Sequence, residues 1–127
     1  MDGVSALRFD NVAPGDYFVV VRHRNHLAVI TSGMRTLNKT VDSIIDFTLQ
    51  GSAFGTDALH IFPNGSTALI NGDANGDGSI NATDRSITWN TRNQIGYLEG
   101  DCNMDGGVNA SDRSITWNNR NTATWVP

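Results

Sequence analysis

Two stretches of the chain repeat one pattern of aspartate, asparagine and glycine: "GDANGDGSINATD" at residues 72–84 and "GDCNMDGGVNASD" at residues 100–112. The match extends without a gap to "NGDANGDGSINATDRSITWNTRN" and "EGDCNMDGGVNASDRSITWNNRN", which begin at residues 71 and 99, an offset of 28 residues. Self-similarity of this length at one offset indicates an internal duplication. The duplication therefore determines how the second half of the chain is organised.

Each copy places oxygen-bearing side chains at the first, third, fifth, ninth and twelfth positions of a 12-residue loop. A hard divalent cation needs this spacing, because the chain must curl around it to present several oxygens at about 2.3–2.6 Å. Gly78 and Gly106 stand at the sixth position, where the sharpest turn favours a residue without a Cβ atom. The backbone carbonyl at the seventh position would complete the set. The predicted metal ligands are Asp73, Asn75, Asp77, Ser79, Asn81 and Asp84 in the first loop, and Asp101, Asn103, Asp105, Gly107, Asn109 and Asp112 in the second.

Calcium is the ion that these loops favour. Many flexible oxygen ligands suit Ca²⁺, whereas the smaller Mg²⁺ keeps its waters, and the loops lack the nitrogen and sulfur ligands that zinc and copper prefer. Carboxylates brought together without a cation would repel each other by up to about 4 kcal/mol for each close pair at an effective dielectric constant near 20. For one copy alone, a surface turn rich in Gly, Asn and Asp is the alternative. Two copies in register favour two Ca²⁺ per chain.

The pattern Asp-x-Asn-x-Asp-Gly-x-(Ile/Val)-Asn-x-x-Asp, present twice with a helix expected after each loop, resembles the type I dockerins. These are calcium-binding modules that dock onto cohesin domains in cellulosomes and related secreted assemblies. The resemblance covers about residues 71–121 and implies EF-hand-like loops that lack the first helix, with Asp84 and Asp112 as bidentate closing ligands. Ile80 and Val108, at the eighth position, are expected to point inward where the two loops approach each other.

The same resemblance implies which residues contact a cohesin-type partner. In dockerins these are the tenth and eleventh loop positions, together with basic residues further along the helix. The matching residues here are Ala82, Thr83, Arg85 and Arg92 in the first copy, and Ala110, Ser111, Arg113 and Arg120 in the second. Because the two sets are nearly the same, a partner could bind either copy after a half-turn rotation.

A short helix is expected after each loop, with its body over residues 85–90 and 113–118. An Asn at the start of each helix can act as N-cap, and an Asp three residues later places negative charge in the first turn; these pairs are Asn81 with Asp84 and Asn109 with Asp112. Trp89 and Trp117 have two interpretations. Large aromatic side chains can anchor a partner, but we expect both to be buried against the other repeat or the preceding domain.

Residues 1–70 show the alternation of half-buried strands joined by tight turns. Apolar residues alternate through "LRFDNVAPGDYFVVVRHRNHLAVITSG", the stretch "TVDSIIDFTLQG" continues in the same way, and Asn64-Gly65 between two apolar runs predicts a hairpin. The phrase "FDNVAPGDYFVVV" resembles the strand-turn-strand of prealbumin-like or Ig-like sandwich modules. We therefore predict an α+β chain, with a small antiparallel β-sandwich or sheet at residues 1–70 and a dockerin-like pair of loop–helix repeats at residues 71–127.

The stretch "HRNH", residues 23–26, invites a metal or catalytic interpretation. Side chains three residues apart on a strand face opposite sides, so only a tight turn could bring His23 and His26 together. We favour a hairpin turn at Arg24-Asn25, with both histidines in structural hydrogen bonds, over a metal site.

Composition argues against several other functions. The formal net charge is −4 and no basic run is present, so a nucleic-acid partner is not expected. The single Cys102 allows no internal disulfide, and an anionic loop disfavours its thiolate. No apolar window is long enough to insert into a membrane. Since no nucleophile elbow or phosphate loop is present and the loop carboxylates are assigned to calcium, we expect no enzymatic activity.

These observations predict a calcium-dependent noncovalent attachment module within a longer protein that is secreted or displayed at the cell surface. One alternative is a structural terminus, in which calcium locks the repeats against the β module without any cohesin. The other is a β module that binds carbohydrate, with calcium as support. In that case Tyr17, Phe18 and Phe62 would have to form an exposed aromatic platform.

Overall fold

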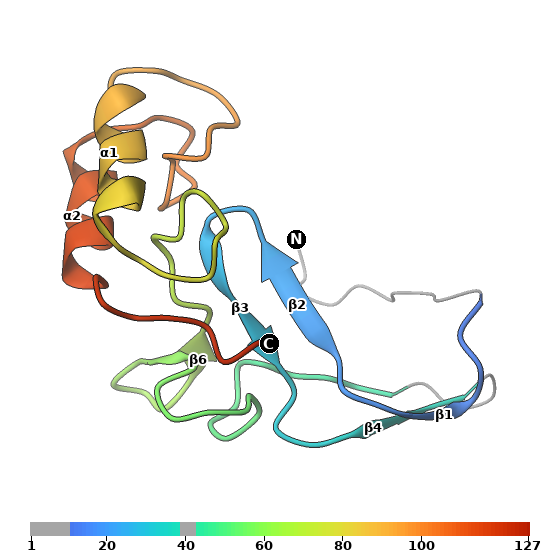
Figure 1. Cartoon of the computed structure of the whole chain (residues 1–127). Helices are drawn as coiled ribbons and strands as arrows, with labels where there is room; N and C mark the ends of the chain where they lie inside the picture. The colour runs from blue at the N-terminus through green and yellow to red at the C-terminus, as the bar shows by residue number, and fades with distance from the viewer. Residues whose placement is uncertain (1–10, 39–42) are drawn as a thin grey trace.

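The computed structural model describes residues 11–38 and 43–127, which adopt a mixed α+β architecture (Figure 1). Short strands occupy the first part of this chain and two helices the second. The strand predicted around Leu7 and Phe9 lies outside the described residues. The elements are β1 (Gly15–Tyr17), β2 (Val20–His23), β3 (His26–Ile30), β4 (Arg35–Leu37), β5 (His60–Ile61), β6 (Thr67–Ala68), α1 (Ala82–Asn90) and α2 (Ala110–Asn118).

The described strands form three separate antiparallel pairs, where the sequence predicted one small sandwich or sheet. β1 pairs with β4, β2 with β3, and β5 with β6. Two predicted turns are confirmed. His23 and His26 are partners across a tight turn at Arg24-Asn25, and β5 and β6 flank the turn that contains Asn64-Gly65.

The strand predicted over residues 40–51 is wrong for residues 43–51, which form loop and turns; the three residues before them lie outside the described part. One reason is local hydrogen bonding by Asp46. Its carboxylate accepts the backbone N–H of Thr48 at 2.8 Å and the hydroxyl at 2.6 Å, a side-chain turn that competes with strand pairing. Ile44 is also 87% exposed, so the apolar alternation does not mark a buried face.

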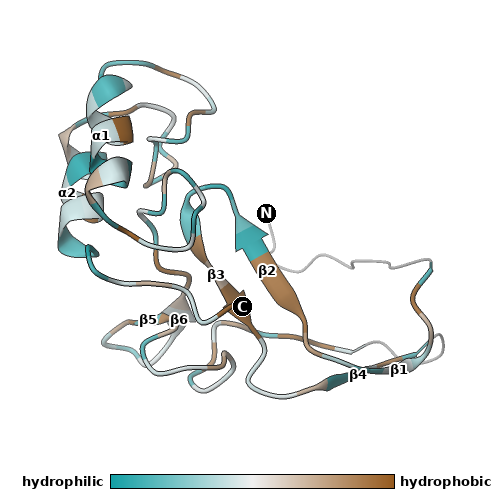
Figure 2. Cartoon of the chain, in the orientation of Figure 1, coloured by the Kyte–Doolittle hydropathy of each residue, from teal (hydrophilic) through white to brown (hydrophobic). Residues whose placement is uncertain are grey.

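The small hydrophobic core lies against β3. Figure 2 shows apolar residues along β2 and β3, whereas the helices are mostly polar outside. The core residues are Val29, Ala53 and Leu59, with Val21, Phe47, Ala58 and Leu69 packed against them. β3 is also covered by the C-terminal segment, because the Thr124 hydroxyl donates to the Ala28 carbonyl at 2.6 Å. Leu27, Ala28 and Val29 are buried in succession, so the buried stretch of β3 does not alternate.

Both helices begin with the predicted caps. The Asn81 side chain accepts the N–H of Thr83 at 2.7 Å, and Asp84 accepts the N–H of Asn81 at 2.8 Å, which completes a capping box. Asn109 and Asp112 form the same box at α2. The helices therefore begin three residues earlier than the predicted bodies.

The duplicated structure includes the segments after the helices, and each of them pairs with the loop of the other copy, a pairing that the sequence match did not reveal. The segment after α1 bonds to the second loop, through Asn93 N–H to Val108 O at 2.8 Å and Val108 N–H to Gln94 O at 3.0 Å. The segment after α2 bonds in the same way to Ile80 in the first loop. Ile80 and Val108 are each 1% exposed, so their predicted inward orientation is confirmed. Each loop is thus held by the copy that it does not belong to.

The repeat region is joined directly to the strands. Leu27 N–H donates to Ile70 O at 2.8 Å, and Gly72 N–H donates to Asn25 O at 2.9 Å. The predicted domain boundary at residue 70 therefore falls in a segment that is paired with the start of β3.

Candidate metal centre

The side chains of the first loop turn inward and bond to the loop's own backbone. Asp73 Oδ2 accepts the N–H of Gly78 at 3.1 Å, and Asp77 Oδ1 accepts the N–H of Ser79 at 2.9 Å. Asn75 Oδ1 accepts the N–H of Asp77 at 3.0 Å. These bonds fold the segment into a tight loop and fix the orientation of three predicted ligands.

The second loop repeats this arrangement. Asp101 Oδ2 accepts the N–H of Gly106 at 3.1 Å, and Asp105 Oδ1 accepts the N–H of Gly107 at 3.0 Å. Asn103 Oδ1 accepts the N–H of Asp105 at 3.0 Å. The three bonds that recur in both copies indicate that the repeated residues determine most of the loop conformation, although Asp101 Oδ1 also accepts the N–H of Asp105 at 3.1 Å.

The twelfth-position carboxylates close the loops. Asp84 Oδ1 accepts the N–H of Asn75 at 3.2 Å, while its Oδ2 accepts the N–H of Asn81. Asp112 makes the equivalent bonds in the second copy. Each of these carboxylates therefore joins the start of its loop to the start of the following helix.

Each loop buries two carboxylates almost completely. Asp73 and Asp101 are 2% exposed, and Asp84 and Asp112 are 0% exposed. Burial raises the pKa of Asp73 above its usual value, and the nearby Asp84 and Asp77 raise it further. Asp73 Oδ1 is buried without a hydrogen-bond partner. A buried charge of this kind is costly unless a cation or further donors compensate it.

The donor chemistry of each loop suits Ca²⁺, although acidic side chains alone do not make the site. In the described part of the chain, no three His, Cys, Asp or Glu side chains are grouped so that they could hold a metal ion. The ligands of each loop would therefore include amide and backbone oxygens, which are common calcium ligands. Cys102 adds no thiolate, because burial and then the neighbouring Asp112 raise its pKa to about 12.

Two predicted ligand positions are engaged elsewhere. The fifth-position Asp77 and Asp105 are exposed, and each accepts a bond from the amide of the asparagine two residues before it, at 2.7 and 2.8 Å. The ninth-position Asn81 and Asn109 use Oδ1 to cap the helices. Each of these oxygens has a second lone pair, and in EF-hand loops the ninth position often binds the ion through a water. At the seventh position, the carbonyl of Ser79 accepts the Asn81 amide at 3.3 Å.

A cation from the strand region approaches only the second loop. Arg24 Nη2 lies 3.8 Å from Asp101 Oδ2, the one ion pair among the described residues, and its guanidinium lies 3.7 Å from the centre of the Tyr97 ring. The neighbouring Asn25 donates through Nδ2 to the Asp101 carbonyl. Sequence reasoning identified the turn at Arg24-Asn25 but contained no sign of where the turn would dock.

The residues assigned to partner contact are exposed on or just after the two helices: Ala82, Thr83, Arg85, Arg92, Ala110, Ser111, Arg113 and Arg120. Their arginines surround two indoles. Arg92 and Arg113 lie 4.3 and 5.5 Å from the Trp89 ring, and Arg120 and Arg85 lie 4.1 and 5.1 Å from the Trp117 ring. Each indole therefore contacts one arginine of its own copy and one of the other. Both tryptophans are 49% exposed, so the expected burial is wrong.

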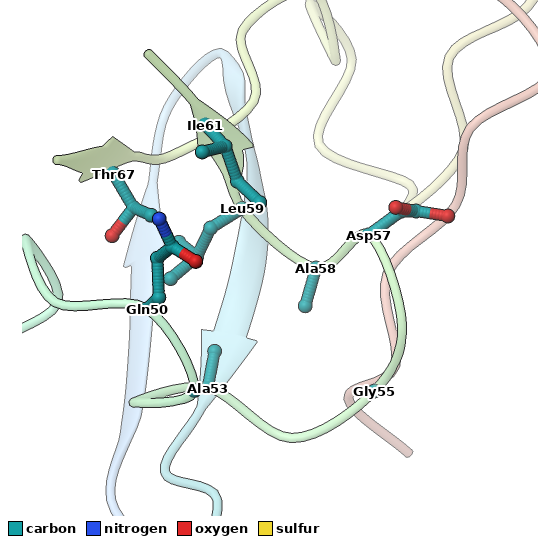
Figure 3. A pocket seen from close by; sticks show the side chains of 9 residues that line it. Gln50, Ala53, Gly55, Asp57, Ala58, Leu59, Ile61 and Thr67 are labelled. Atoms are coloured by element: carbon teal, nitrogen blue, oxygen red, sulfur yellow. The ribbon is translucent and has the colours of Figure 1, made fainter. Parts of the chain in front are cut away.

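Two hollows lie outside the loops. An open one of about 390 Å³ between the helices is lined by Arg85, Arg113, Ser114, Trp117 and Asn118. A smaller one of about 140 Å³ lies beside the core (Figure 3), where Asp57, Ala58 and Leu59 are among the residues that line it. Neither hollow contains the proposed aromatic platform.

Within residues 11–38 and 43–127, no helix is both long enough and apolar enough to cross a membrane. Comparison of the chain with models of protein families, with curated proteins and with solved structures gave no match in any of the three.

Proposed function

We propose that the chain binds two Ca²⁺, one in each loop, and serves as a calcium-dependent attachment module of a larger secreted or surface protein. The observation that supports this most is the buried, unpartnered Oδ1 of Asp73 in a loop whose other carboxylates carry the same charge. A divalent cation compensates that charge and uses the free lone pairs. The equivalent loop around Asp101 has the same donors and would take the second ion.

The attachment face in this proposal is the outer surface of α1 and α2. It carries four exposed arginines and two half-exposed indoles, while Asp84 and Asp112 are buried beneath it. Arginine and tryptophan are enriched where binding energy concentrates in protein interfaces. The two copies present nearly the same side chains, so we infer a dockerin-like mode in which a cohesin-type partner binds either copy.

A structural role is the second candidate, and the C-terminal segment favours it. Ile80 N–H donates to Thr122 O at 2.8 Å, and Trp125 Nε1 donates to Thr56 O at 2.9 Å. The segment thus connects the first loop to the strand region. Calcium in that loop would stabilise both regions even without a partner.

The attachment role and the structural role can be distinguished by whether the chain retains a partner in the presence of calcium. The full chain, immobilised and saturated with Ca²⁺, is exposed to a panel of cohesin domains and then washed with a chelator. Under the attachment proposal a cohesin is retained in calcium and released by the chelator. If none is retained while the chelator still lowers the melting temperature, the structural role stands and attachment is wrong.

A further inference from the structure

Three donor atoms converge at the turn between β2 and β3, apart from the calcium loops. His23 Nδ1 lies 3.0 Å from His26 Nδ1 and 3.1 Å from Asn25 Oδ1, and His26 Nδ1 lies 2.8 Å from the same oxygen. The three atoms thus form a nearly equilateral triangle. The two rings stand almost perpendicular, at 88°, with their centres 4.7 Å apart.

No placement of protons satisfies all three of these contacts. Asn25 Oδ1 can only accept, and a neutral imidazole carries one ring proton. If both Nδ1 atoms are protonated, both can donate to Oδ1, but no proton then lies between the two nitrogens, which are 3.0 Å apart. If only one is protonated, the other presents its lone pair to the lone pairs of Oδ1. Hydrogen bonding alone therefore leaves at least one close contact unsatisfied.

The orientation of Asn25 is fixed by a separate contact. Its Nδ2 donates to the carbonyl of Asp101, and the residue is 0% exposed. Because a carbonyl only accepts, the amide must turn its nitrogen to Asp101 and its oxygen to the imidazoles. Oδ1 is therefore held at the triangle and cannot exchange places with Nδ2.

We propose, against the expectation from the sequence, that His23 Nδ1, His26 Nδ1 and Asn25 Oδ1 bind a divalent first-row transition ion. Imidazole nitrogen is a preferred ligand of such ions. Imidazole nitrogen lies about 2.1 Å from such an ion, so two ligands are about 3.4 Å apart in a tetrahedron and about 3.0 Å apart at right angles. The observed separations of 2.8–3.1 Å fit the right angle. The donors match one face of an octahedron, and water would fill the remaining positions.

Two further observations agree with this assignment. Both imidazoles are only partly buried, so an ion can reach them from solvent. Burial, then His23 and then Arg24, lower the pKa of His26 to about 4, so this imidazole is neutral near pH 7 and its Nε2–H tautomer presents the Nδ1 lone pair to an ion. None of the three donors belongs to a predicted calcium ligand set, so this proposal does not rest on the proposed function.

The test is a calorimetric titration of the tag-free full chain with Zn²⁺, in saturating Ca²⁺ so that the oxygen-rich loops are occupied. We expect one Zn²⁺ per chain, and His23→Gln or His26→Gln should weaken binding at least about tenfold. The third histidine of the chain, His60, is exposed on β5 and provides the matched control. His60→Gln should bind as the unmodified chain does. Absence of zinc binding, or equal binding by all the variants, overturns the proposal.

A measurement on the unmodified chain covers the case in which a variant does not fold. Nitrogen-15 NMR of the imidazoles, recorded with and without one equivalent of Zn²⁺, should shift the Nδ1 resonances of His23 and His26 and leave those of His60 in place. Shifts confined to His60, or no shifts at all, contradict the site.

Discussion

The two loops are near copies in sequence and conformation, yet their electrostatic surroundings differ. In the first loop, Asp73 has a raised pKa and an unpartnered oxygen. In the second, Asp101 has Arg24 3.8 Å away and receives Asn25 on its carbonyl. Asp101 Oδ1 also accepts the N–H of Asp105 at 3.1 Å, whereas the equivalent Asp73 Oδ1 has no partner, so the duplicated motif fixes most of its own hydrogen bonds but not its neighbours. We therefore expect the first loop to depend more strongly on calcium than the second.

The largest effect is expected where the copies are equivalent, on the helix surfaces. Replacing Thr83 and Arg85 with alanine, or Ser111 and Arg113, should weaken partner binding only slightly, because the other copy still presents its face. Replacing all four should abolish binding. Affinity for a cohesin that the unmodified chain retains is the measurement, and the melting temperature of each variant serves as control. Strong loss from one pair alone would show that the copies are not interchangeable.

Replacing the first ligand of each loop, Asp73 or Asp101, should affect the stability of the chain differently. In calcium, Asp73→Asn should remove one ion and the stabilisation linked to it, about 2.7 kcal/mol at a hundredfold excess over Kd. Without calcium the sign should reverse, because the substitution removes a buried charge with an unpartnered oxygen. Asp101→Asn should destabilise the chain in both conditions, since it deprives Arg24 of its partner. Urea unfolding of both variants, each in calcium and in chelator, gives the free energy of unfolding in all four cases. If both variants change this free energy equally in each condition, the two loops do not differ in their dependence on calcium.

The role of Arg24 can be tested directly. Because its guanidinium competes with a cation for Asp101, Arg24→Gln should raise the calcium affinity of the second loop by a factor of about 2–5, the effect of a modest ion pair. The affinity of the first loop should not change. Arg22→Gln, an exposed arginine on β2, is the matched control. A lower calcium affinity in Arg24→Gln would mean that the turn supports the second loop more than it competes there.

The smallest effect concerns acid. Since the pKa of His26 is lowered from 6.5 to about 4, the unfolded chain binds more protons between these values, and this residue's contribution to stability is lost as pH falls through that range. The turn that contains His26 docks on the second loop, so acid should loosen this loop first. Hydrogen exchange of the amides around Asp101 and Asp73, compared at pH 7 and pH 5 in chelator, shows which loop loosens first. His26→Gln should reduce the difference, and earlier loosening of the first loop would contradict the expectation.

The local features of the fold were predictable and the long-range ones were not. The helix caps followed from spacing within one repeat, because those interactions span a few residues, and the inward orientation of Ile80 and Val108 followed from the resemblance to dockerin loops. The docking of Arg24 on Asp101 joins residues 77 positions apart, and nothing in the "HRNH" stretch indicates its partner. Trp89 and Trp117 were expected to be buried against the other repeat or the preceding domain. Instead each contacts two arginine side chains, one from each copy, which leave half of its surface exposed.

The central claim is that the duplicated loops bind calcium, and calorimetric titration of the calcium-depleted full chain tests it most directly. We expect two Ca²⁺ per chain, with the tighter site lost in Asp73→Asn and the weaker one in Asp101→Asn. The melting temperature should also fall when a chelator is added. A titration without binding heat, together with a melting temperature that is the same in calcium and in chelator, would contradict the account.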